Sequence, residues 1–70
     1  MNIQSPLSGR IIEVCVQTGD RVGEGQTLLV LETMKMEYRL RSPLCGIVTQ
    51  IAAAPEQRVT PEDVLLTIEA

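Results

Sequence analysis

Histidine is absent from this 70-residue chain, and so are tryptophan and phenylalanine. Histidine is the side chain most often used as a general base and is a common metal ligand, so its absence removes the simplest catalytic arrangements. No serine or cysteine has a base beside it, and no group of carboxylates follows a metal-ligand spacing. The sequence therefore predicts no catalytic residue, no metal site and no enzyme activity of the chain by itself.

Basic residues and long apolar runs are also scarce. The chain has a formal net charge of −3, a pI near 4.7 and a single aromatic residue, Tyr38. Nucleic-acid-binding proteins instead show basic patches and stacking aromatics. No apolar run approaches the roughly 20 residues of a membrane helix, and the first residues do not resemble a secretory signal. We expect no nucleic-acid partner, no membrane partner and a cytoplasmic location.

Cysteine is limited to Cys15 and Cys45. Two cysteines are too few for a disulfide framework, and without histidine they do not make a zinc site. Free cysteine behaves as a small apolar residue and is often buried. We expect both to be buried free thiols with no chemical role.

The feature that organises the sequence is an internal repeat. Residues 5–33 and residues 42–70 align without a gap at an offset of 37 residues, which indicates one structural unit used twice. The identical pairs are Ser5/Ser42, Pro6/Pro43, Leu7/Leu44, Gly9/Gly46, Arg21/Arg58, Val22/Val59, Leu28/Leu65, Leu29/Leu66 and Glu32/Glu69.

The apolar residues alternate or form short blocks bounded by glycine, proline and aspartate, which is typical of strands. Residues 1–70 are therefore predicted to form one all-β domain. The outer strands of the two copies are expected to pair around a pseudo-two-fold axis, so that Met1 and Ala70 either fray or lie close together. The predicted strands are Asn2–Ser5, Gly9–Val16, Arg21–Val22, Thr27–Glu32, Met36–Arg41, Gly46–Ile51, Arg58–Val59 and Leu65–Glu69.

The second copy lacks three glycines of the first, since Glu56, Thr60 and Glu62 stand where the first copy has Gly19, Gly23 and Gly25. If position 56 requires a positive φ, Glu56 carries a strain of about 1 kcal/mol. Pro55 and Pro61 lie nearby, so we expect the second copy to hold its turns by proline stiffness.

Between the two copies lies the only lysine, Lys35, flanked by Met34 and Met36. A hairpin with Met34 and Lys35 as a two-residue loop needs positive φ at both, which costs non-glycine residues about 1–2 kcal/mol each. A turn kept despite that strain indicates side chains retained for an external partner. The alternatives are that Lys35 only adds a solubilising charge and that Met36 packs inward. Glu32, Thr33 and Glu37 would surround the tip with polar groups.

The segment Glu32-Thr33-Met34-Lys35-Met36-Glu37 resembles the Ala-Met-Lys-Met signature of biotinyl domains, the carrier domains of biotin-dependent carboxylases. Further matches are Gly19-Asp20 with Gly25-Gln26, Ser42-Pro43 with Gly46, and the closing Ile68-Glu69. The resemblance spans nearly the whole chain. Two departures are Thr33 in place of the usual alanine and Glu56 in place of glycine.

The resemblance implies a flattened β-barrel or sandwich of two four-stranded antiparallel sheets with the lysine on an exposed hairpin. It implies biotin in amide linkage to Lys35, attached by a biotin–protein ligase, with Met34 and Met36 serving recognition. A biotin carboxylase and a carboxyltransferase would be the partners between which the carboxyl group is carried. The connection from Val16 to Arg21 leaves no room for a protruding thumb. The chain is therefore similar to the thumbless carrier domains of propionyl-, methylcrotonyl- or pyruvate-type carboxylases, or to small biotin/lipoyl attachment proteins.

Three other interpretations remain open. A lipoyl carrier shares the fold, but lipoyl domains typically show Asp-Lys-Ala, so lipoate as sole modification is disfavoured relative to dual biotin and lipoyl attachment. An unmodified barrel could use the Met-Lys-Met tip only for protein docking. A structural assembly module would also account for the repeat.

Overall fold

The computed structural model describes residues 1–70 as eight strands joined by turns. Four strands have the predicted bounds, and the other four differ by one or two residues at an end. The protein contains no helix, and therefore none with the length and apolar character needed to cross a membrane. The strands are β1 (Asn2–Gln4), β2 (Gly9–Val14), β3 (Arg21–Val22), β4 (Thr27–Thr33), β5 (Met36–Arg41), β6 (Gly46–Ile51), β7 (Arg58–Val59) and β8 (Val64–Glu69).

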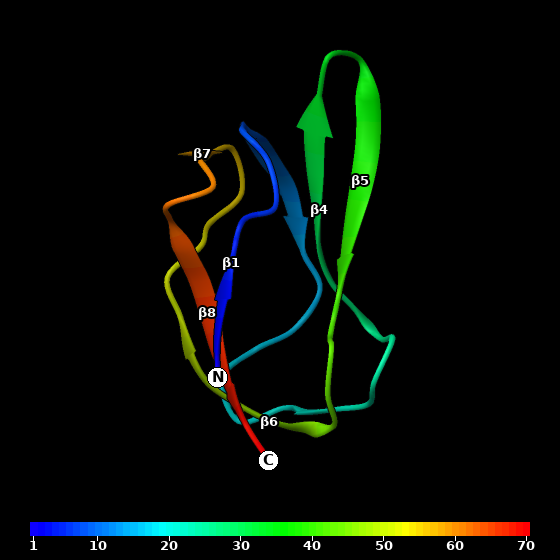
Figure 1. The fold of residues 1–70 in the computed structure, drawn as a ribbon, viewed down its shortest axis with the longest axis vertical. Coiled ribbons are helices and arrows are strands. Elements are labelled where there is room, and N and C mark those ends of the chain that lie inside the picture. The colour runs from blue at the N-terminus through cyan, green and yellow to red at the C-terminus, as the bar shows by residue number, and fades with distance from the viewer.

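The strands form two four-stranded antiparallel sheets, with orders β1-β8-β6-β3 and β5-β4-β2-β7. This confirms the predicted fold class. Figure 1 shows that the β4–β5 hairpin projects beyond the other strands at one end, while both chain termini lie toward the opposite end. The two sheets are related by the repeat. An offset of 37 residues converts β2, β3 and β4 into β6, β7 and β8, so the order β4-β2-β7 in one sheet corresponds to β8-β6-β3 in the other.

The core lies between the sheets and is entirely aliphatic. Period-two alternation turns one face of each strand inward, where Ile11, Leu31, Val48 and Ile68 are fully buried. No buried side-chain nitrogen or oxygen lacks a hydrogen-bond partner. Burial of apolar surface contributes about 25 cal/mol per Å² to stability, and in this protein aliphatic side chains supply nearly all of it.

The two copies cross-link each other through equivalent backbone hydrogen bonds. The N–H of Gly19 donates to the carbonyl of Val48 (2.7 Å), and the N–H of Glu56 donates to the carbonyl of Ile11 (2.6 Å). Because each turn binds a strand of the other copy, neither copy completes its hydrogen bonding alone. The repeat therefore produces one domain rather than two.

Glu56 has the positive φ that its alignment with glycine predicted. Its φ is 72°, and that of Gly19 is 96°. Each residue is the third of a turn whose last side chain, Asp20 or Gln57, accepts a hydrogen bond from the first residue's N–H. The same turn thus forms in both copies, once with glycine and once with a strained glutamate.

The expectation that the cysteines are buried is wrong, because both are exposed. Cys15 lies between Val14 and Val16, and the alternation that turns Val16 inward turns Cys15 outward. Its partial desolvation, followed by the nearby Glu13 charge, raises the pKa of the Cys15 thiol. Cys45 lies in the turn before β6, where its sulfur accepts a hydrogen bond from the N–H of Glu24 at 3.4 Å.

The predicted pairing between strands of the two copies is confirmed, since β2 of the first copy lies beside β7 of the second and β3 lies beside β6. Strand β1, which precedes the first copy, lies beside β8. The N-terminal ammonium of Met1 donates to the carbonyl of Ile68 at 2.6 Å, and the N–H of Ile68 donates to the carbonyl of Met1. Both chain ends are thereby attached to one sheet, away from the projecting hairpin (Figure 1).

Candidate functional site

The candidate site is the tip of the β4–β5 hairpin. Thr33 and Met36 are the last paired residues, and Met34 and Lys35 form the loop with φ values of 48° and 67°. This confirms the predicted two-residue loop. The two positive φ values are those of a hairpin turn whose twist follows that of the flanking strands. Such φ values strain any residue with a side chain, so glycine is the usual residue at these positions.

The side chains at the tip are turned to solvent. Met34 is 92% exposed and Met36 is 70% exposed, and Lys35 is exposed between them. The alternative that Met36 packs inward is therefore wrong. Two large apolar side chains in water beside a lysine give no stability to this chain, so they mark a surface available to another molecule.

Below the tip, Glu32 on β4 and Glu37 on β5 face each other as a cross-strand pair. Like charges directly opposite each other are destabilising. Arg10 on β2 offsets this repulsion, because its Nη2 lies 2.9 Å from Oε1 of Glu32, and Glu56 lies 3.9 Å from its Nη1. The hydrogen bond to Glu32, and then its negative charge, raise the pKa of the Arg10 guanidinium.

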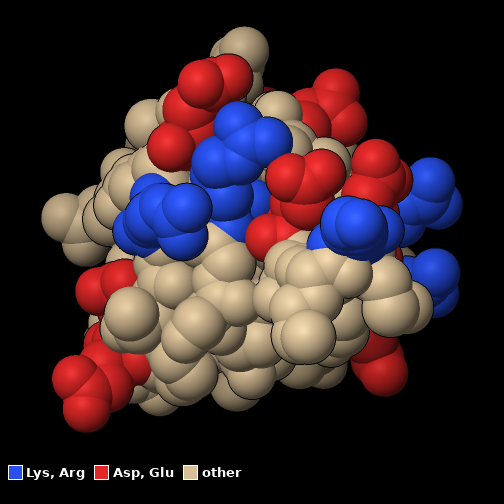
Figure 2. Space-filling model, turned by 90° about the horizontal axis from the view of Figure 1, so that it is seen from above, with Lys and Arg blue, Asp and Glu red and all other residues tan.

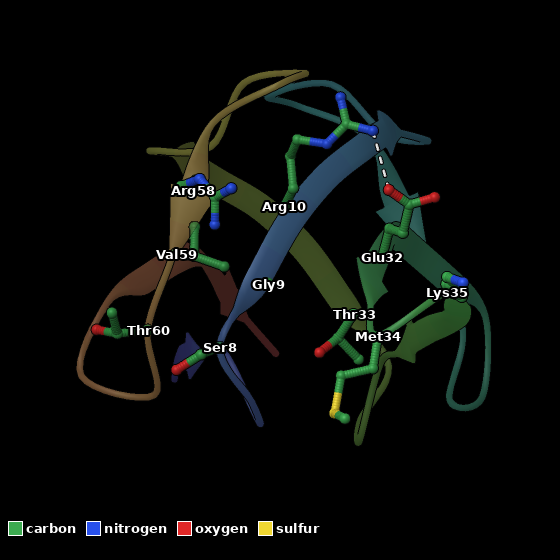
Figure 3. Close-up of a pocket in the computed structure, with 10 residues that line it drawn as sticks. All are labelled: Ser8, Gly9, Arg10, Glu32, Thr33, Met34, Lys35, Arg58, Val59 and Thr60. Atoms are coloured by element: carbon green, nitrogen blue, oxygen red, sulfur yellow. Dashed lines mark hydrogen bonds and ion pairs between the residues drawn. The ribbon is translucent and has the colours of Figure 1, made fainter.

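Beside the tip lies a shallow depression of about 400 Å³. Figure 3 shows Gly9 near its centre, with Thr33 and Met34 on one side, Val59 and Thr60 on the other, and the Lys35 amine pointing away from it. A Cβ on Gly9 would lie 2.6 Å from the carbonyl oxygen of Glu32, so glycine lets β2 approach the base of the hairpin closely. The lining residues are Ser8, Gly9, Arg10, Glu32, Thr33, Met34, Lys35, Arg58, Val59 and Thr60.

Charges of both signs lie over part of this end of the molecule. In Figure 2, which looks onto the end where the hairpin projects, the Lys and Arg side chains are interspersed with Asp and Glu. A mixed surface of this kind gives no strong field of one sign.

The structure brings all six predicted site residues together: Lys35, Met34 and Met36 at the tip, and Glu32, Thr33 and Glu37 at its base. Lys35 is the only lysine, and its primary amine is the one side-chain group at the tip that can be acylated. No group of three or more His, Cys, Asp or Glu side chains lies together in the structure.

Sequence reasoning missed Arg10. Arg10 and Glu32 are 22 residues apart and meet only because β2 pairs with β4. A signal was present in the repeat, because the second copy has Ile47 at the position of Arg10 while retaining Glu69 at the position of Glu32. The glutamate is thus present in both copies, but its arginine partner is present only in the first. This difference distinguishes the end of the molecule that carries Lys35.

Comparison with known proteins shows which sequences and structures this chain resembles. The sequence profile of the biotin/lipoyl family, described as "Biotin-requiring enzyme", matches residues 1–68. The chain is 41% identical over 64 residues to a biotin carboxyl carrier protein of Streptococcus mutans, covering 91% of this chain and 49% of that protein. It is 35% identical over 68 residues to the alpha subunit of the mitochondrial methylcrotonoyl-CoA carboxylase of rice (Oryza sativa subsp. japonica), covering 97% of this chain and 9% of that subunit.

Among solved structures, the urea carboxylase of Kluyveromyces lactis superimposes with a TM-score of 0.90 and 25% identity. The match covers 99% of this chain and 6% of the carboxylase. The chain thus spans half or less of the length of these proteins. It corresponds to one of their domains.

Proposed function

This chain belongs to the biotin/lipoyl family and is a biotin carboxyl carrier domain of the kind found in biotin-dependent carboxylases, and we propose that it holds biotin in an amide bond to the ε-amine of Lys35. The observation that carries the proposal is the position of the only lysine, exposed in the turn of the projecting hairpin.

The residues around Lys35 fit this attachment. No hydrogen bond or ion pair engages the Lys35 amine, so a modifying enzyme can reach it without breaking a contact. Biotin, once attached, supplies a ureido nitrogen that accepts and releases a carboxyl group. The strands hold the attachment point, and a flexible lysine arm on a fixed base raises the effective concentration of its end at nearby sites.

Three partners follow from the proposal. A biotin–protein ligase would load Lys35, with Met34 and Met36 as its apolar contacts, since methionine adapts to differently shaped surfaces. A biotin carboxylase and a carboxyltransferase would then receive the loaded tip in turn. The support is that relatives of the chain are named as carboxylases and as a carrier protein. Catalysis would belong to these partners, and a cytoplasmic location stays a prediction.

The test is the intact mass of the protein after co-expression with a biotin–protein ligase, with a parallel sample given lipoic acid and a lipoyl ligase. We expect one added biotinyl group in the first sample and none in Lys35→Arg, because the guanidinium does not form the amide. An added lipoyl group in the second sample would make the protein a dual carrier. No added mass in either sample would refute the proposal and leave the docking hairpin as the function of the tip.

A further inference from the structure

Strand β5 leaves one edge of its sheet open. It pairs only with β4 and is the last strand of the order β5-β4-β2-β7. With six residues it is the longest of the four edge strands. An open edge of this length is a template for another strand, and proteins usually protect it with charges, bulges or a covering segment.

The register of the hairpin determines which backbone groups are free. In a two-residue hairpin the closing pair, here Thr33 and Met36, exchanges hydrogen bonds, and the following pairs alternate. Glu37 and Arg39 therefore direct their N–H and C=O groups to the open edge. Neither backbone takes part in a hydrogen bond of the turns or loops.

The side chains of Glu37 and Arg39 are also without partners. Every ion pair in the structure involves Arg10, and none includes Glu37 or Arg39. Both line a depression on the outer face of the sheet together with Val30. The edge thus carries two opposite charges, two residues apart on one face, and neither is neutralised within the chain.

We propose that β5 pairs with β5 of a second copy of this chain, antiparallel and around a two-fold axis at Tyr38. In this register Glu37 of each copy lies opposite Arg39 of the other, which gives two cross-copy ion pairs and four backbone hydrogen bonds. On the inner face Tyr38 meets its own counterpart, at the closer, non-hydrogen-bonded kind of pair. The two sheets would become one of eight strands.

Charge distinguishes this register from its neighbours, of which two keep the outer faces together. One shift by two residues places Glu37 opposite Glu37 and Lys35 opposite Arg39, so every charged pair in it is repulsive. The shift in the other direction has two attractive Glu37–Arg41 pairs, but it places Arg39 opposite Arg39 on the axis, at the centre of the paired strands. Like charges directly opposite are unfavourable, and in the register centred on Tyr38 they meet only at the two ends of the paired edge.

The pairing leaves both attachment points free. The two hairpin tips point in opposite directions, separated along the paired edge by about 20 Å, or six residues at about 3.4 Å each. At either end Lys35 approaches Arg41 of the other copy, and this like-charge contact weakens the pairing. Neutralising Lys35, by substitution or by acylation, should therefore strengthen it.

The experiment is sedimentation equilibrium of the unmodified protein from about 10 µM to about 2 mM at about 0.15 M salt, because one strand pair supports only weak association, with Kd near 0.1–1 mM. We expect a monomer–dimer equilibrium, with concentration-dependent amide shifts in NMR spectra confined to β5 and its neighbour β4. A protein that stays monomeric to the highest concentration would overturn the proposal. So would an association whose shifts lie on other strands.

Charge reversal gives the decisive control. Glu37→Arg and Arg39→Glu each place two like-charge pairs at the interface, and each should weaken self-association by roughly thirtyfold. Mixed one to one, however, the two variants form attractive pairs at both positions and should associate about as well as the parent. Glu62→Arg makes the same charge change in an exposed turn and should have no effect. A mixture that fails to recover association would overturn the proposal.

Two neutral variants serve as a second test in case a charge reversal prevents folding. Glu37→Gln and Arg39→Gln remove the attraction without adding repulsion, and each should weaken dimerisation by a few-fold while circular dichroism shows an unchanged fold. Lys35→Gln should strengthen it by a similar factor. These measurements need neither biotin nor a ligase, so the proposal can fail or succeed independently of the attachment at Lys35.

Discussion

The two ends of the molecule are built from equivalent parts and differ in what those parts carry. The depression beside the hairpin has a counterpart beside the C-terminus, lined by Arg21, Val22, Gly23, Cys45, Gly46, Ile47 and Ala70. Under the 37-residue offset these match residues that line the first depression. Where the hairpin end has Ser8 and Arg10, the terminal end has Cys45 and Ile47.

The difference lies in the segment that follows β4. This strand passes through Met34 and Lys35 into β5, and the turn between them holds the only lysine of the sequence. Arg10, which stabilises Glu32 below that turn, is found only in the first copy.

The largest expected effect tests whether the two copies contribute equally to the core. Leu28 and Leu65 are equivalent and both are fully buried. Leu28→Ala and Leu65→Ala should each lower the free energy of unfolding by about 2–5 kcal/mol, because each loses buried area and leaves a cavity. Urea denaturation of both variants measures this. Losses that differ by more than about 1.5 kcal/mol would show that the copies are energetically unequal.

The second prediction tests whether the hairpin end alone serves recognition. Met34→Ala and Met36→Ala should slow biotin loading and carboxyl transfer on the order of tenfold, which is about 1.4 kcal/mol of activation free energy. They should leave the free energy of unfolding within about 0.5 kcal/mol, since exposed side chains contribute little to stability. Met1→Ala, at the exposed residue of the other end, is the control and should leave both rates unchanged. A lower free energy of unfolding with unchanged rates would instead show that the methionines have a structural role.

The third prediction concerns the shared turn. Glu56→Gly should stabilise the protein by about 1 kcal/mol, because glycine adopts the positive φ without strain. Gly19→Ala should destabilise it by about the same amount, since nothing within 4 Å obstructs the new methyl group and only the φ of 96° is unfavourable. Thermal unfolding of the two variants gives the comparison. Destabilisation by Glu56→Gly would mean that the contact of Glu56 with Arg10 outweighs the strain.

The smallest effect distinguishes the two exposed thiols. Both cysteines should react with a thiol reagent in the folded protein, giving two labels per chain. Burial and the charge of Glu13 raise the pKa of Cys15, so fewer Cys15 thiols are ionised at a given pH. The alkylation rate of Cys15 should therefore reach half its maximum at a higher pH in the folded protein than in urea. Mass spectrometry of peptides labelled over a range of pH measures the shift, and an unchanged midpoint would contradict it.

Much of the fold followed from local pattern. Alternating valine, isoleucine and leucine between turn residues gave the strands, and β5 and β6 have the predicted bounds. Alignment with Gly19 predicted the positive φ of Glu56, and the absence of glycine between Met34 and Met36 predicted a strained loop. These features depend on neighbouring residues or on the repeat, both of which are visible in the sequence.

The cysteines were mispredicted for a physical reason. Residue type favours burial of cysteine, but the position of Cys15 between Val14 and Val16 turns it outward, and strand geometry outweighs the preference of one small side chain. Cys45 follows the same rule as its counterpart Ser8, since both lie in the exposed turn before a strand. Position in the repeat was the better guide.

The sequence by itself determined the repeat, the all-β architecture, the place of the single lysine and the strain of its turn. Only the tertiary structure decided that Arg10 neutralises Glu32, that the two depressions are equivalent, and that β5 presents Glu37 and Arg39 on an open edge. Each of these depends on which strands become neighbours and on which face each side chain lies. Strand pairing and facing are set by hydrogen bonding and burial between residues far apart in the chain.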